Sequence, residues 1–145
     1  MILLDSNIFI YHLTSHPTFG QKAKMLLTSI EKGEHQAIAS FITYAEILTL
    51  PAKEKKEDLI RKYSELLLHF PHLRFCPVTE NIAHRAAMLR GQHTSLKLMD
   101  TIILATAIEE NAETLVTEDK ILRIKNLPLQ VLSLNEFFHS SIPTG

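Results

Sequence analysis

Short apolar runs alternate with longer amphipathic segments along the chain, and this alternation restricts the fold more than any other feature of the sequence. The runs at residues 2–4 and 115–117 are too short for helices and have the composition of buried strands. Parallel strands that are neighbours in a sheet need a crossover connection, which is usually a helix. The pattern therefore predicts an α/β protein, a three-layer α/β/α sandwich with a central, mainly parallel sheet.

The apolar spacing and the turn residues predict where the individual elements lie. Gly33 follows one helix in the C-cap position, and Pro51 is expected to stop another. Strands are expected at residues 2–4, 36–40, 73–78, 115–117 and 129–132. Helices are expected at residues 6–13, 19–32, 43–50, 53–69, 79–90 and 101–110, with a helical turn from residue 119 and a turn or helix at 135–139.

The length and composition fit one globular domain, residues 1–145. The chain is 46% apolar and 21% charged, so it can bury a full core, and it has no apolar run long enough to span a bilayer. The first apolar residues are followed by Asp5 and have no basic start, unlike a signal peptide, and the single cysteine, Cys76, cannot form an internal disulfide. We therefore expect a cytoplasmic protein. The net charge of −1 argues against binding nucleic acid by bulk charge alone but allows a local basic rim.

Three of the 4 aspartates lie beside apolar runs. Asp5 ends the first predicted strand, Asp119 comes two residues after the fourth, and Asp100 begins a helix that is apolar on nearly every face. Glu46 has comparable apolar neighbours, whereas Asp58 lies in a charge-rich run and is expected to be solvated. Functional groups of open α/β sheets gather at the carboxyl ends of the strands, so we expect these carboxylates to converge there.

Helix capping is the alternative interpretation of the same residues. Each of Asp5, Asp100 and Asp119 could be a helix N-cap, which is worth ~1 kcal/mol. Residues 43–46 also match the S/T-x-x-E capping box. Capping and function are compatible, because a helix start both orients and favours a carboxylate.

Four converging carboxylates need either protons or a cation. Two carboxylates ~4 Å apart repel each other by about 4 kcal/mol at an effective dielectric constant near 20. Oxygen ligands select hard divalent ions such as Mg²⁺ or Mn²⁺ rather than zinc. A metal ion held by carboxylates suggests chemistry on phosphate esters, because it polarises the phosphoryl oxygen and lowers the pKa of bound water.

Four motifs occur in the order typical of one known family. The motifs are Leu4-Asp5-Ser6-Asn7, Ser40-Phe41-Ile42-Thr43-Tyr44-Ala45-Glu46, Leu98-Met99-Asp100 continuing into Ile103-Leu104-Ala105-Thr106-Ala107, and Leu115-Val116-Thr117-Glu118-Asp119. With these motifs the sequence resembles the PIN-domain family of metal-dependent ribonucleases, and within it the toxins of VapBC-type toxin–antitoxin pairs. The resemblance covers essentially the whole chain.

The resemblance implies a function and a set of site residues. It implies an Mg²⁺- or Mn²⁺-dependent endoribonuclease that hydrolyses RNA phosphodiester bonds, forms a homodimer and is held inactive by a small antitoxin protein. The implied catalytic and metal-binding residues are Asp5, Glu46, Asp100 and Asp119, with Asn7 and Thr117 supporting the pocket.

One position departs from the family pattern. Many relatives carry a further Asp shortly after the last motif, where this chain has Ile121-Leu122. Asp119 would then act alone or with Glu118, which leaves open whether one or two metal ions bind.

Two other enzyme or signalling classes also place Asp at the end of a strand, but the sequence does not match them. A haloacid-dehalogenase-type phosphotransferase needs a second Asp at the position of Asn7. A receiver domain needs an acidic pair near the first strand and a Lys after the last strand, and neither is evident here. A non-catalytic PIN-like RNA-binding or assembly module and a housekeeping RNA-processing nuclease stay open as alternatives.

The basic and histidine side chains give weaker signals. His12 and His16 do not form the H-E-x-x-H zinc motif, and we expect them to be surface or structural residues. The basic residues that precede Asp100 are either contacts for RNA phosphates or an ordinary exposed helix face. These residues are Arg85, Arg90, His93 and Lys97.

Overall fold

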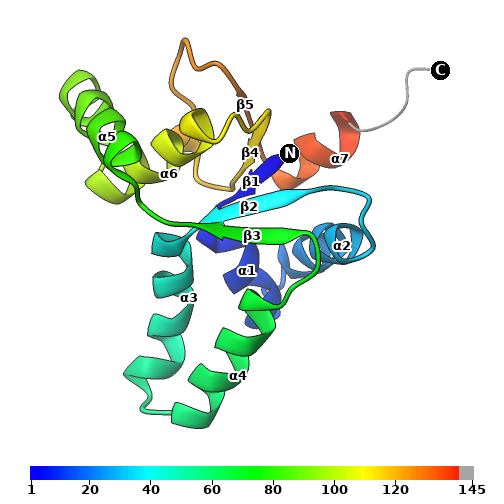
Figure 1. Ribbon diagram of the computed structural model, residues 1–145. Coiled ribbons are helices and arrows are strands. Elements are labelled where there is room, and N and C mark those ends of the chain that lie inside the picture. Colours follow the sequence, from blue (N-terminus) through cyan, green and yellow to red (C-terminus); the bar gives the residue numbers. More distant parts are fainter. Residues whose placement is uncertain (141–145) are drawn as a thin grey trace.

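A computed structural model describes residues 1–140 and contains a five-stranded parallel sheet in the order β3-β2-β1-β4-β5 (Figure 1). The first strand in sequence lies at the centre, so the chain crosses over to one side of β1 and later to the other. This is the parallel sheet that the sequence predicts. The strands are β1 (Ile2–Leu4), β2 (Ala37–Ser40), β3 (Leu73–Cys76), β4 (Thr114–Val116) and β5 (Gln130–Leu132).

Helices cover both faces of the sheet, which confirms the three-layer α/β/α architecture (Figure 1). Because side chains alternate along a strand, Ile2 and Leu4 pack against one set of helices and Leu3 against the other. The first set comprises α1 (Ser6–Leu13), α2 (Gly20–Glu31), α7 (Leu134–Ser140) and parts of α3 (Phe41–Lys53) and α4 (Glu57–Leu68). The second set comprises α5 (Glu80–Gln92) and α6 (Leu98–Glu109), with the short 3₁₀ helix η1 (Lys120–Leu122).

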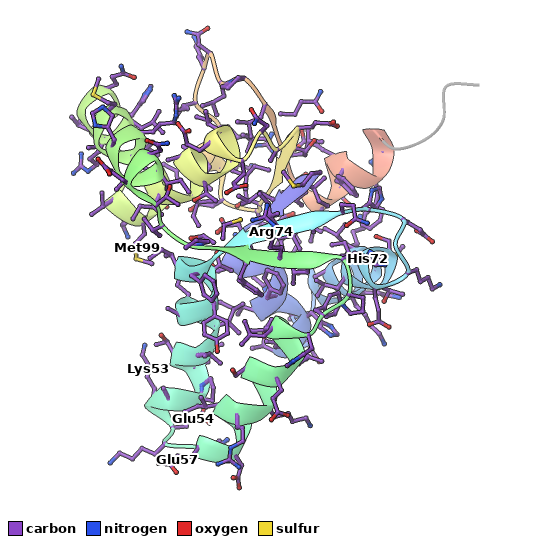
Figure 2. All side chains as sticks on the ribbon, viewed as in Figure 1. Lys53, Glu54, Glu57, His72, Arg74 and Met99 are labelled. Atoms are coloured by element: carbon purple, nitrogen blue, oxygen red, sulfur yellow. The ribbon has the colours of Figure 1, made fainter. Side chains whose placement is uncertain are left out.

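Helices α3 and α4 form a hairpin that projects from the sheet, with Lys53, Glu54 and Glu57 near its tip (Figure 2). The expected stop at Pro51 is wrong: Pro51 is buried inside α3, which runs on to Lys53. The expected start of α4 at residue 53 is also wrong, because Lys55 adopts a left-handed conformation with φ of 56° and breaks the helix.

Two helix starts near the site also differ from the sequence prediction. Strand β2 leads directly into α3, whose N-cap is Ser40, with its Oγ accepting a hydrogen bond from the Ile42 N–H at 3.0 Å. Thr43 therefore lies inside the helix, and the capping box expected at residues 43–46 is wrong. Helix α6 begins at Leu98, three residues before the expected start, with Lys97 as its N-cap. Most other element boundaries agree within one or two residues.

Three further observations concern the chain as a whole. Cys76 is fully buried among apolar side chains, so the single cysteine is a core residue. None of the helices in residues 1–140 is long and apolar enough to cross a bilayer. The expected single domain extends to residue 145, and residues 141–145 lie outside the described part of the chain.

Candidate active site

Asp5 lies at the carboxyl end of β1 and is also the N-cap of α1. Its Oδ1 accepts a hydrogen bond from the Ser6 N–H at 2.8 Å, and its Oδ2 accepts one from the Thr117 hydroxyl at 2.7 Å. The Asn7 amide also donates to Oδ2, over a longer 3.4 Å. The residue is only 8% exposed. The sequence places Asp5 correctly, and its capping and site interpretations both fit the geometry.

Thr117 connects Asp5 to the loop that follows β4. It is almost fully buried, and its Oγ1 accepts hydrogen bonds from the Asn7 amide at 3.2 Å and from the Asp119 N–H at 3.0 Å. One hydroxyl thus connects Asp5, Asn7 and Asp119 across the neighbouring strands β1 and β4. The Asp119 carboxylate accepts a hydrogen bond from the Ile121 N–H at 3.1 Å, as the N-cap of η1.

Asp119 is exposed, whereas the sequence suggested a residue sheltered from solvent. The strand ends at Val116, and the loop turns outward before Asp119 is reached. Glu118, considered as its helper, is turned toward α7: its Oε1 accepts a hydrogen bond from the Leu134 N–H at 2.7 Å.

Asp100 enters the site from the first turn of α6. It is the third residue of the helix rather than the N-cap, and its Oδ2 accepts a hydrogen bond from the Lys97 N–H at 2.9 Å. Asp100 therefore does cap the start of α6, as the capping interpretation expected, but it does so from the third helical position and not as the N-cap residue. The buried body of α6 holds Asp100 at the edge of the sheet, where the residue is half-buried.

Glu46 comes from the second turn of α3 and is also half-buried. Burial raises the pKa of Glu46 above its ordinary value of 4.5, and the negative charges of Asp5 and Asp100 raise it further, against a hydrogen bond from Ser6 that lowers it. Helix α3 starts directly at the end of β2, so its first turns stand over the carboxyl edge of the sheet.

The structure places Asp5 within electrostatic reach of each of the other three acidic residues, and Glu46 within reach of Asp100 as well. Burial raises the pKa of Asp5 above its ordinary 3.8; hydrogen bonds from Thr117 and Ser6 lower it, and the charges of Asp119 and Asp100 raise it. The charge of Asp100 also acts on Glu46. Each pair of neighbours in this cluster repels, so the site favours a bound cation or proton. We call Asp5, Glu46, Asp100 and Asp119 the acidic cluster.

Sequence reasoning missed one neighbour of the cluster, Tyr11. Burial raises the pKa of its phenol above the ordinary 10.0, and the charges of Glu118, Asp5 and Asp119 raise it further. Tyr11 lies one helical turn after Asn7, so the two share a face of α1, a spacing that the sequence displays.

The donor set fits a hard divalent cation. All the side chains of the cluster offer oxygen, and Asn7 Oδ1 is buried without a hydrogen-bond partner. Across residues 1–140, no group of three or more His, Cys, Asp or Glu side chains is arranged to ligate one ion directly. Mg²⁺ usually keeps several waters and binds one or two carboxylates, so the arrangement suits an ion held partly through water.

Two of the four basic residues that precede Asp100, Arg85 and Arg90, have other partners close by. Arg85 pairs with Glu109 at 2.5 Å, and Arg90 donates to the Thr94 carbonyl oxygen at 3.2 Å. These contacts lie within the α5–α6 layer and its connecting loop.

A parallel sheet with carboxylates gathered at its carboxyl edge defines a class of α/β proteins, and the family follows from comparison with known sequences. The model of the PIN domain family matches residues 2–126, so the chain belongs to the PIN domain family. The family resemblance drawn from the four motifs is thereby confirmed. A search of curated protein sequences finds no significant match.

Solved structures share the fold over nearly the whole chain. A toxin–antitoxin complex from Klebsiella pneumoniae is 26% identical, with a TM-score of 0.69, covering 92% of this chain and 98% of that one. VapBC2 from Rickettsia felis, bound to a DNA fragment from its promoter, is also 26% identical, with a TM-score of 0.72 and the same coverage. FitAcB from Neisseria gonorrhoeae is 24% identical, with a TM-score of 0.70 over 92% of this chain and 98% of that one.

Proposed function

We propose that this PIN-domain protein is a metal-dependent endoribonuclease that hydrolyses RNA phosphodiester bonds and is the toxin of a toxin–antitoxin pair. The observation that carries the proposal is the convergence of Asp5, Glu46, Asp100 and Asp119 from four separate segments at one edge of the sheet. A structural core has no need to gather like charges at this cost, whereas a site for a divalent cation does.

Each residue has a role in this proposal. Asp5, Asp100 and Asp119 hold one or two Mg²⁺ or Mn²⁺ ions, and Glu46 either completes the ligand set or orients the attacking water. A bound ion would polarise the phosphoryl oxygen. It would also lower the pKa of a bound water, so that hydroxide is available at neutral pH. Thr117 and Asn7 fix the Asp5 carboxylate through the hydrogen bonds described above. Water would attack the phosphorus in line, so that a new P–O bond forms as the bond to the 3′ oxygen breaks. The 3′ oxygen would leave as a hydroxyl after taking up a proton, and no protein nucleophile is required.

The partners follow from the structural neighbours. The complexes from Klebsiella pneumoniae and Rickettsia felis, each 26% identical to this chain, are a toxin–antitoxin complex and VapBC2 bound to its promoter. We propose that this chain likewise binds a small antitoxin protein. We also propose, from the family resemblance and the sequence, that it forms a homodimer and acts in the cytoplasm.

The test compares two aspartates of the same chain. Asp100 belongs to the acidic cluster, whereas the side chain of Asp58 is fully exposed on α4. We expect Asp100→Asn to abolish Mn²⁺-dependent cleavage of RNA and to weaken Mn²⁺ binding in isothermal titration. The matched control, Asp58→Asn, should retain both.

Two results would contradict the proposal. Cleavage by Asp100→Asn at the rate of the unaltered protein would remove Asp100 from the site. The absence of any carboxylate-dependent Mn²⁺ binding would instead favour a non-catalytic RNA-binding or assembly module.

A further inference from the structure

A polar pocket lies at the junction of α1 and α2, outside the acidic cluster. Its volume is about 410 Å³. It is lined by His12, Ser15, His16, Gly20, Gln21 and Lys24. These lining residues, all in the described part of the chain, include hydroxyl, amide, imidazole and ammonium groups and no carboxylate.

The walls of the pocket are fixed by backbone hydrogen bonds. Helix α1 ends in a Schellman motif, in which the His16 N–H donates to the Tyr11 carbonyl at 2.9 Å and the Ser15 N–H to the His12 carbonyl at 3.2 Å. Gly20 packs against this turn so closely that a Cβ there would stand 3.1 Å from the Tyr11 carbonyl oxygen. A Cβ at position 20 would force the neighbouring backbone to move by a few tenths of an ångström, so the glycine allows the two helices to pack this closely.

The ring of His16 is fixed as well. Its Nδ1 accepts hydrogen bonds from the N–H groups of Thr18 and Phe19, both at 3.1 Å. Because Nδ1 is an acceptor, the proton of the neutral ring is on Nε2, which is then a hydrogen-bond donor. The ring also stacks on Phe19, with centroids 5.2 Å apart.

The pocket has a positive charge that is not neutralised. Lys24 forms no ion pair within residues 1–140. Besides burial, the ammonium of Lys24 lowers the pKa of His12, so its field reaches across the pocket. A Lys ammonium beside neutral donors, with no carboxylate, is a setting that accepts an anion.

Tyr11 connects this pocket to the acidic cluster. Its ring lies 4.6 Å from that of His16, centroid to centroid, while its phenol is subject to the charges of Asp5 and Asp119. Side chains on a helix lean toward its N-terminus, which carries the Tyr11 phenol back toward Asp5. Helix α1 has 8 residues, a length of about 12 Å. An RNA strand at the acidic cluster would therefore reach the pocket within a few nucleotides.

We propose that the pocket at Ser15, His16, Gln21 and Lys24 binds a backbone phosphate of the RNA substrate, a few nucleotides from the phosphate at the acidic cluster. The inference rests on the proposed ribonuclease function. It meets a physical need, since the acidic cluster repels a polyanion and the chain as a whole has a net charge of −1. A phosphate contact away from the reacting bond positions the strand without reading its sequence.

The test changes the charge of one exposed side chain. Lys24→Gln removes the proposed phosphate contact, and Lys24→Arg retains the positive charge. Lys53→Gln is the matched control, since Lys53 lies near the tip of the α3–α4 hairpin, outside the pocket (Figure 2). The measurement is steady-state cleavage of a short single-stranded RNA with Mn²⁺ at several concentrations of monovalent salt, giving KM and kcat separately.

We expect Lys24→Gln to raise KM several-fold with kcat unchanged, because the contact is made equally in the ground and transition states. The slope of log(1/KM) against log salt should become shallower by about 0.7, the value for one phosphate contact on a single strand. Lys24→Arg and Lys53→Gln should both keep the original slope.

The outcomes separate this inference from the function on which it rests. Active enzyme whose salt slope is the same in Lys24→Gln and Lys53→Gln would overturn the phosphate pocket and leave the ribonuclease proposal intact. A fall in kcat with KM unchanged would also overturn it. RNA that no variant cleaves, the unaltered protein included, would overturn both.

Discussion

Asp5 shows how one residue combines a structural and a functional role. Its carboxylate caps α1 and accepts hydrogen bonds from Thr117 and Asn7, contacts that normally favour the charged form. Burial and the neighbouring carboxylates nevertheless raise its pKa. The ionised site is therefore destabilising in the absence of a cation, a cost that is typical of functional sites.

The residue-scale prediction is that Asp5→Asn stabilises the protein when no divalent ion is present. A carboxyl whose pKa is raised by folding contributes stability below its unfolded pKa, and this stability is lost as the pH rises through the folded pKa. Above the unfolded pKa the carboxyl of Asp5 therefore costs stability, whereas the amide has no charge to bury and keeps an oxygen to accept from the Ser6 N–H. Thermal unfolding in chelator should show a higher Tm for Asp5→Asn than for the unaltered protein.

Added Mn²⁺ should reverse the order of the two Tm values, so that the unaltered protein becomes more stable than Asp5→Asn. A ligand at a hundredfold excess over its Kd stabilises the folded state by about 2.7 kcal/mol, and only the protein with an intact cluster should gain it. Asp58→Asn, which changes an exposed carboxylate in the same way, should follow the unaltered protein in both conditions. A lower Tm for Asp5→Asn in chelator would show that the hydrogen bonds of Asp5 outweigh its burial.

At the scale of helices and strands, the sequence predicts the strand ends that carry the site better than the helix starts and the exposure of the site residues. Asp5 follows from its place after a buried run, because the end of a parallel strand is fixed by the hydrophobic pattern. The sequence prediction starts α6 three residues too late, because Lys97 is not a typical N-cap residue and so does not mark a helix start. The exposure of Asp119 depends on how the loop after β4 turns, which only the packed structure determines.

Helix α7 has a capping box that links it to η1. The Ser133 N–H donates to the Glu136 carboxylate at 3.2 Å, and the Glu136 N–H donates to the Ser133 hydroxyl, also at 3.2 Å. Glu136 also pairs with Arg123, just after η1. Through these contacts one carboxylate joins the loop that follows the acidic cluster to the C-terminal helix.

The prediction at this scale concerns acid stability. The bond from Arg123 and those from Ser133 lower the pKa of Glu136 from 4.5 to about 2. A lowered carboxyl pKa gives stability that is fully present above the unfolded value of 4.5 and is lost as the pH falls through the folded value of about 2. Glu136→Gln should therefore have a lower Tm than the unaltered protein at pH 7, and the difference should disappear near pH 2.

Arg123→Gln is the companion variant for this prediction, because it removes the other side of the ion pair. Like Glu136→Gln, it should lower the Tm at pH 7. It should also raise the pKa of Glu136, which can be measured by NMR. A Tm difference between the unaltered protein and Glu136→Gln that persists at pH 2 would assign the effect to packing instead of charge.

For the molecule as a whole, the distribution of charge matters more than its sum. The net charge is −1, yet negative charge gathers at the carboxyl edge of the sheet, and Lys24 on α2 forms no ion pair within the described residues. In the proposed function, an RNA strand would meet both the acidic cluster and the phosphate pocket at Lys24. The free toxin would then attack the RNA of the cell that makes it, and the proposed antitoxin would restrain it.

Expression of the chain alone in a bacterial host should therefore arrest growth. Asp100→Asn should abolish the arrest while Asp58→Asn retains it, because only the first belongs to the acidic cluster. Co-expression of a small protein encoded by a short reading frame next to the gene should restore growth and co-purify with the chain. Normal growth, with a purified chain that still cleaves RNA, would instead indicate a housekeeping RNA-processing nuclease, since the chemistry would be present without the need for restraint.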